Sequence, residues 1–114
     1  MTTKDQRQNA DFIAELKYLT TEEGGRKTPA LSGYRPQVKF DFSVMETSGQ
    51  QTFLNKKIVY PGDTVLAAIK IVSVTSFANS LKVGMTFEIR EGSKIVGHGK
   101  ITELLNLSLK KAGI

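Results

Sequence analysis

The chain has 114 residues, of which 39% are hydrophobic, which is enough for one domain with a core of its own. It contains no cysteine, and this excludes disulfides, thiolate metal sites and thiol nucleophiles. Sixteen Lys and Arg residues against eleven Asp and Glu residues give a net charge of +5, which favours polyanion partners but is also ordinary for the solubility of a small domain.

The first ten residues are polar and lack the apolar stretch of a signal peptide. No apolar run approaches the roughly 20 residues that a transmembrane helix requires. We therefore expect residues 1–10 to form a mobile polar tail. We also expect a soluble, cytoplasmic protein that has no membrane partner.

Most of the chain shows the alternation of apolar and polar residues that is typical of half-buried strands. The run over residues 64–74 is apolar on both faces, as in a central strand or a barrel strand. The pattern predicts strands over residues 12–18, 38–44, 64–74, 83–89 and 95–105.

Glycine-containing segments with turn chemistry separate these runs and predict turns at residues 23–26, 47–49, 61–63 and 91–93. Residues 76–82 are weakly patterned and predict a loop. The C-terminal residues 107–111 form either a helical turn or a frayed end. Many strands with short turns indicate an all-β sandwich or barrel.

The sequence contains no recognisable catalytic motif. There is no phosphate-cradling P-loop, and Gly97 and Gly99 lack the strand–turn–helix context of a dinucleotide site. These glycines are better explained as relief of crowding, or as a bulge, in the last strand. His98, the only histidine, has no Asp or Glu at ligand spacing. The sequence predicts no enzyme, no metal site and no cofactor.

Four short motifs in order carry a family resemblance. Residues 22–29 and 33–37 resemble the E-G-G-R-H-T-P and G-Y-R-P-Q-F segments of the third domain of elongation factor Tu. Residues 61–63 resemble its P-G-D turn. Residues 87–92 and 96–99 resemble its F-A-I-R-E-G and V-G-A-G segments. The chain thus looks like a free-standing copy of this domain.

The resemblance implies a closed, six-stranded antiparallel β-barrel over residues 11–105, between the tail and a C-terminal extension at 106–114. In the family, one face of this barrel meets the T stem of aminoacyl-tRNA. Another face packs on the GTPase domain and serves partner proteins. Here the GTPase domain and the second domain are missing, so no elongation activity is expected.

The residues that the resemblance implies for RNA contact can be carried over one by one. Arginine and glutamine of the R-P-Q segment correspond to Arg35 and Gln37, and the R-E-G segment gives Glu91 and Gly92. A turn glycine lets backbone N–H groups approach a phosphate closely. The family's histidine before T-P is Lys27 here, which strengthens attraction to phosphate. The remaining RNA-binding candidates are Thr47 and Ser48, because the threonine that faces the T stem corresponds to one of these two.

Structural explanations stand beside these roles. Gly92 is what a tight hairpin needs in any case, and Arg35 or Arg90 with Glu91 could form an ordinary surface ion pair. Two departures from the family pattern concern possible partner surfaces. Glu88 stands in place of alanine where the family packs near its GTPase domain, and Ala30 and Leu31 stand in place of two aromatic residues.

Two functions follow from the resemblance. The first is a non-catalytic module that binds tRNA or other RNA, with no evident DNA specificity. The second is a protein-interaction module for a translation factor, a GTPase or another protein, with Gly24, Leu31 and Glu88 as interface candidates.

Overall fold

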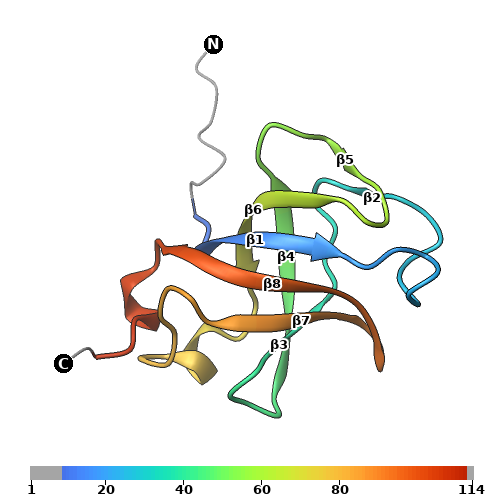
Figure 1. Ribbon diagram of the computed structural model, residues 1–114. Helices are drawn as coiled ribbons and strands as arrows, with labels where there is room; N and C mark the ends of the chain where they lie inside the picture. Colours follow the sequence, from blue (N-terminus) through green and yellow to red (C-terminus); the bar gives the residue numbers. More distant parts are fainter. Residues whose placement is uncertain (1–8, 113–114) are drawn as a thin grey trace.

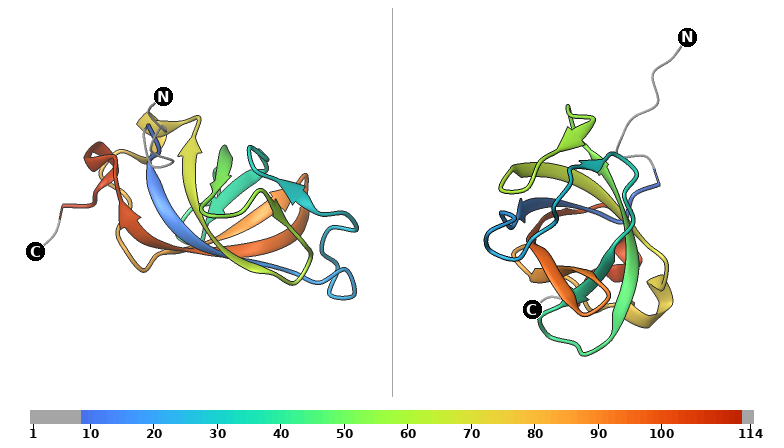
Figure 2. Two further views of the ribbon diagram at one scale, coloured as in Figure 1. Left: turned by 90° about the horizontal axis from the view of Figure 1, so that it is seen from above. Right: turned by 90° about the vertical axis from the view of Figure 1, so that its right-hand side faces the viewer.

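The computed structural model describes residues 9–112, which form a closed barrel of six antiparallel strands in the order β1-β6-β4-β3-β7-β8 (Figure 1). A separate two-stranded sheet joins β2 and β5. The elements in chain order are β1 Phe12–Tyr18, β2 Ala30–Leu31, β3 Gln37–Phe40, β4 Glu46–Phe53, β5 Ile58–Val59, β6 Thr64–Ile71, η1 Val74–Phe77, β7 Thr86–Glu91, β8 Lys94–Leu104 and η2 Leu107–Leu109. The expected six-stranded barrel is thus confirmed. Seen along its axis, the ring of strands is continuous (Figure 2, right).

The hairpin between β3 and β4 differs from the prediction. The strand expected over residues 38–44 ends at Phe40, because Phe42 and Val44 are exposed in the hairpin loop. The turn expected at 47–49 is wrong, since these residues belong to β4. Gly49 is needed there for packing, because a Cβ on it would lie 2.6 Å from the Val38 Cγ2.

Two other strands end at different residues than the alternation predicts. β6 stops at Ile71, because Val72 is 67% exposed and no longer faces the core. β7 starts at Thr86 rather than at Val83, which is also exposed. In both cases the alternation includes a valine that the folded protein leaves exposed, so the strand is shorter than predicted.

Aromatic rings fill the middle of the barrel. Phe12, Phe40 and Phe87 come from three different strands and lie with ring centroids 5.7–6.0 Å apart. Gly99 lies directly beside this group, because a Cβ on it would meet the Phe87 Cζ at 2.1 Å. A Cβ on Gly97 would come 2.9 Å from the Lys17 carbonyl oxygen. The expectation that these two glycines relieve crowding is confirmed.

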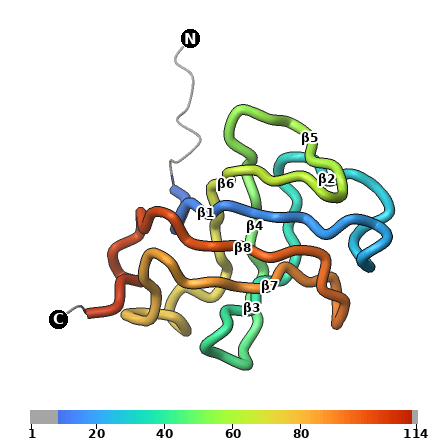
Figure 3. Tube along the Cα trace, in the orientation of Figure 1, coloured from blue at the N-terminus to red at the C-terminus, as the bar shows by residue number. Residues whose placement is uncertain are grey.

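The two ends of the described chain meet at one side of the barrel (Figure 3). The Asp11 carboxylate accepts hydrogen bonds from the Ile71 N–H at 2.8 Å and from the Asn106 Nδ2 at 2.9 Å. The C-terminal segment forms the helical turn η2, and Leu109 in it is fully buried. Residues 106–112 therefore pack on the barrel rather than fray. Residues 1–8 of the expected tail lie outside the described part.

His98 is exposed on β8, where it pairs with Glu88 of β7 and with Lys17 of β1. Among residues 9–112, no three His, Asp or Glu side chains are arranged to hold a metal ion. No helix in this range is long and apolar enough to cross a membrane.

Candidate nucleic-acid interface

The loop between β1 and β2 has a defined shape. At its start the Thr20 N–H donates to the Glu23 carboxylate at 2.8 Å, and the Glu23 N–H donates to the Thr20 hydroxyl at 3.1 Å. The hydrogen bond from the Thr20 N–H is the main cause that lowers the pKa of Glu23, and the Thr20 hydroxyl lowers it further. Gly25 is packed so closely that a Cβ would lie 2.4 Å from the Leu19 carbonyl oxygen. The loop is thereby held where Arg26 reaches Glu91 of the β7–β8 hairpin.

Arg26, Tyr34 and Glu91 form a cluster at this end of the barrel. The Arg26 Nη1 and the Tyr34 hydroxyl both donate to the Glu91 Oε2. The guanidinium lies over the Tyr34 ring, with its Cζ 4.6 Å from the ring centroid. Arg26 also donates to the carbonyl oxygens of Thr28 and Pro29 at 3.2 and 3.3 Å. One arginine thus ties its own loop to the hairpin.

Partial burial and close contacts shift the pKa values of Tyr34 and Arg26 in this cluster. Burial raises the pKa of Tyr34, and its hydrogen bond to Glu91 raises it further. For Arg26, burial disfavours the charge, but the contacts with Tyr34 and Glu91 outweigh it and raise the pKa of the guanidinium. The neutral phenol and the charged guanidinium therefore persist at physiological pH and hold the Glu91 carboxylate.

These contacts correct two expectations. The partner of Glu91 is neither Arg35 nor Arg90, but Arg26. Arg90 instead pairs with Glu88 at 2.5 Å and with Glu46 at 3.4 Å. The strand register explains the pairing of Arg90. β4 and β7 flank β3 on either side, and Glu46 of β4 lies on the same outer face as Glu88 and Arg90 of β7. Sequence reasoning missed the role of Arg26, since nothing local indicates a contact 65 residues along the chain.

The β7–β8 hairpin turn has an open backbone. Gly92 has a φ of +63°, in the left-handed region that favours glycine, and it is exposed. A Cβ at this position would meet no atom within 4 Å. The glycine is thus required by the turn conformation and not by packing, and its surface is accessible to a ligand.

Gln37 and Ser48 lie together on the outer face next to this turn. The Gln37 Nε2 donates to the Ser48 Oγ at 3.2 Å, and the strand register pairs Gln37 with both Ser48 and Arg90. Thr47 points the other way: it is 3% exposed, and its hydroxyl accepts from the Ser73 N–H at 3.0 Å. Of the two candidates for the T-stem position, Ser48 is the one with access to solvent.

Arg35 lies on the outer face beside Gln50 of β4 and Lys70 of β6. The predicted RNA residues therefore fall into two groups. Lys27, Glu91 and Gly92 are at the barrel end, while Arg35 joins Gln37 and Ser48 on the adjoining sheet face.

The three protein-interface candidates lie on three different elements and do not form one cluster. Gly24 is exposed in the β1–β2 loop with a φ of +96°, and Leu31 is 64% exposed on β2. Glu88 is half-buried on β7 and bonded to Arg90.

Comparison with known families agrees with this geometry. Residues 6–105 match the family model described as the elongation factor Tu C-terminal domain. The chain belongs to this family. The described barrel, with its strand order and its P-G-D and R-E-G turns, is the elongation factor Tu C-terminal domain fold.

Membership makes the protein a translation-factor-like module. The elongation factor Tu C-terminal domain is a non-catalytic binding domain, and its family is associated with translation components. The cluster of Arg26, Tyr34 and Glu91 thus lies in a domain whose family is a family of binding domains.

Proposed function

We propose that this domain is a non-catalytic, cytoplasmic RNA-binding module, with tRNA as the type of ligand. The proposed surface comprises the barrel end at Lys27 and Gly92 and the adjoining face at Arg35, Gln37 and Ser48. The observation that carries the proposal is the juxtaposition of an exposed lysine loop and an open glycine turn, fastened together by Arg26 and Glu91.

The Gly92 turn supplies a place for phosphate. An exposed backbone without a Cβ lets main-chain N–H groups come close to a phosphate oxygen. Such contacts position a nucleic acid without reading its sequence. The proposal therefore predicts binding that depends on backbone shape and charge more than on base identity.

Lys27 supplies charge from a loop that is ordered in advance. Its neighbour Arg26 fixes the loop through Glu91, Tyr34 and two carbonyl oxygens. A cation on an already ordered loop loses less conformational entropy on binding than one on a flexible loop. Glu91 acts in this account by positioning Arg26, in addition to any contact of its own with ribose.

The sheet face extends the surface beyond the turn. Gln37 and Ser48 present an amide and a hydroxyl that can bond ribose hydroxyls, and the 2′-hydroxyl is what distinguishes RNA from DNA. Arg35 adds a planar guanidinium suited to phosphate. Because only a few cations take part, we expect weak and salt-sensitive binding.

The test is a titration of fluorescently labelled tRNA at 50 and 200 mM salt, with the wild type and the Lys27→Ala variant. The wild type should bind more weakly at the higher salt. The slope of log K against log salt should be smaller by about 0.7–0.9 in the variant, as expected for one lost phosphate contact.

Lys100→Ala is the matched control, because Lys100 is an exposed lysine on β8 away from the proposed surface. It should bind like the wild type apart from a small general effect of charge. Affinity that is independent of salt would contradict the proposal. Equal weakening by the two variants would do so as well, since it would show attraction by net charge alone.

A further inference from the structure

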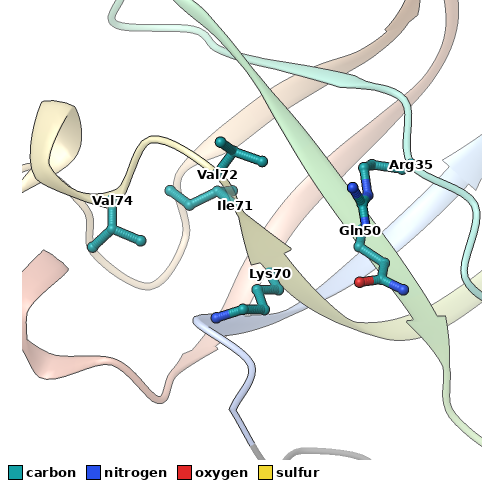
Figure 4. A pocket seen from close by; sticks show the side chains of 6 residues that line it. All are labelled: Arg35, Gln50, Lys70, Ile71, Val72 and Val74. Carbon is teal, nitrogen blue, oxygen red and sulfur yellow. The ribbon is translucent and has the colours of Figure 1, made fainter.

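A shallow groove of about 260 Å³ lies on the outer face of the barrel, between β4, β6 and the start of η1 (Figure 4). Ligand pockets for small molecules and cofactors usually measure about 300–1,000 Å³. This groove is smaller and has room for one or two side chains. Its lining residues are Arg35, Gln50, Lys70, Ile71, Val72 and Val74.

The two cations of the groove lack an acidic partner in the described part of the chain. Arg26 and Arg90 are both paired with glutamates, whereas neither Arg35 nor Lys70 has a carboxylate of residues 9–112 within ion-pair distance. Within the described residues, the Lys70 ammonium donates only to the Asn9 carbonyl oxygen, at 3.3 Å. The groove therefore carries two positive charges that form no ion pair among residues 9–112.

The buried acid Asp11 forms no ion pair with either cation among the described residues. Asp11 is 2% exposed, and its carboxylate is occupied by the Ile71 N–H and the Asn106 amide. An anion that enters the groove thus meets no competing carboxylate among its six lining residues.

Apolar surface lies directly beside the cations. The chain leaves the sheet after Ile71, and Val72 keeps only one strand-like bond, from its N–H to the Ser48 carbonyl oxygen at 3.0 Å. Its side chain is left 67% exposed, although valine is an apolar residue. Val74, partly buried against the core, continues this apolar wall into η1.

Two cations beside an apolar wall favour a ligand that carries both a carboxylate and an apolar group. Arg35 presents a planar fork that suits a carboxylate, and the Gln50 amide can complete the hydrogen bonds of such a group. The valines favour a branched apolar group next to it. RNA fits less well, because none of the six lining residues is aromatic and a base would have nothing to stack on.

We propose that this groove binds an acidic peptide segment of a protein partner. One carboxylate lies between Arg35 and Lys70, and the neighbouring apolar side chain covers Val72 and Val74. The site goes beyond the proposed RNA surface. The two share Arg35, but Lys70, Val72 and Val74 belong to the groove alone.

The test uses three fluorescein-labelled nine-residue peptides and measures their binding by anisotropy. In the first, Glu alternates with Leu. In the second, Gln replaces Glu, and in the third, Ser replaces Leu. The first peptide should bind, and each of the other two about tenfold more weakly, because each lacks one of the two required contacts.

Variants place the binding in the groove. Lys70→Ala and Val72→Ser should each weaken binding of the Glu–Leu peptide by several-fold, and both change exposed side chains. Lys100→Ala is the matched control on β8 and should have no such effect. Lys27→Ala should leave the peptide affinity unchanged, which separates this site from the proposed RNA surface.

Charge reversal gives the sharpest outcome. The double variant Arg35→Glu with Lys70→Glu should lose the Glu–Leu peptide and gain affinity for a peptide in which Lys alternates with Leu. The proposal is overturned if the Glu–Leu peptide shows no binding at millimolar concentration, or if all three peptides bind alike. It is also overturned if Lys70→Ala and Val72→Ser reduce binding of tRNA while no peptide binds, since the groove would then be an RNA surface.

Discussion

Gly99 lies against the ring of Phe87, which is itself 1% exposed and packed between Phe12 and Phe40. A ring in that position cannot give way as the end of a flexible side chain could. Gly99→Ala should therefore lower the free energy of unfolding by about 1–3 kcal/mol through overpacking. Urea denaturation of the two proteins measures the difference.

Lys100→Ala serves as the control for this variant, since it changes the adjacent exposed position of the same strand. Its free energy of unfolding should stay within about 0.5 kcal/mol of the wild type. A Gly99→Ala protein as stable as Lys100→Ala would show that the last strand can shift away from the ring.

Tyr18 makes the stability depend on alkaline pH. Its side chain is 1% exposed, and its hydroxyl donates to the Gln51 Oε1 at 2.5 Å. Burial raises the pKa of Tyr18 above its ordinary value of 10.0. The unfolded chain releases this proton near pH 10 while the folded protein keeps it, so stability is fully present below pH 10 and falls as the pH rises above it.

Comparison of wild type and Tyr18→Phe isolates this effect. The wild type should lose stability above pH 10 with an extra slope of about 1.4 kcal/mol per pH unit, the value for one proton. The slope should be smaller in Tyr18→Phe when the free energy of unfolding is measured between pH 9 and 11.5. Parallel curves for the two proteins would mean that the phenol ionises alike in both states.

At the scale of elements, the β1–β2 loop depends on Arg26. The side chain is 19% exposed and bonds Glu91, Thr28 and Pro29. Arg26→Ala should destabilise the protein by about 1–3 kcal/mol, because hydrogen bonds to charged groups are lost. Amide hydrogen exchange should become faster over residues 19–29, and less so on β4.

Arg26→Lys is the informative companion variant. A lysine keeps the charge but has a single ammonium in place of the planar fork, so it cannot bond Glu91 and the loop carbonyl groups in the same geometry. It should restore little of the exchange protection. Full protection in Arg26→Lys would show that charge alone holds the loop.

The elements also show how far the sequence predicts the fold. Alternation locates β1 correctly, because its inward positions are apolar and its outward ones are mostly charged. It misses β4, whose residues Glu46–Phe53 are mainly polar, with Thr47, Gly49 and Gln51 inside. The buried Thr47 hydroxyl accepts from the Ser73 N–H and the Gln51 Oε1 accepts from the Tyr18 hydroxyl, and such partners lie far along the chain.

The candidate site shows the same limit. Family motifs indicate Gln37, Glu91 and Gly92, but they do not reveal which arginine meets Glu91. That depends on the closure of the barrel, which brings the β1–β2 loop to the β7–β8 hairpin. The inward direction of Thr47 likewise depends on the register of β3 with β4.

At the scale of the whole molecule, the C-terminal segment seals one end of the barrel. Leu109 is fully buried, and the N–H groups of Ser80 and Leu81 donate to its carbonyl oxygen at 3.0 and 2.8 Å. Leu107, two residues earlier, is 69% exposed. The two leucines form a matched pair within one short helical turn.

Leu109→Ala should therefore cost about 2–5 kcal/mol of stability, the range for a leucine removed from a core. Leu107→Ala should change stability by less than about 0.5 kcal/mol. Thermal and urea unfolding of both variants check this. Equal effects would contradict the role of residues 106–112 as part of the packed domain.

The central claim is that RNA binds at the barrel end and the adjoining face. The most direct test is to record backbone amide spectra of ¹⁵N-labelled protein during titration with tRNA at low salt. We predict the largest shifts at Lys27, Gly92 and Ser48, and little change around η2 and Leu109 at the opposite end. Shifts confined to that opposite end, or no shifts at all, would contradict the account.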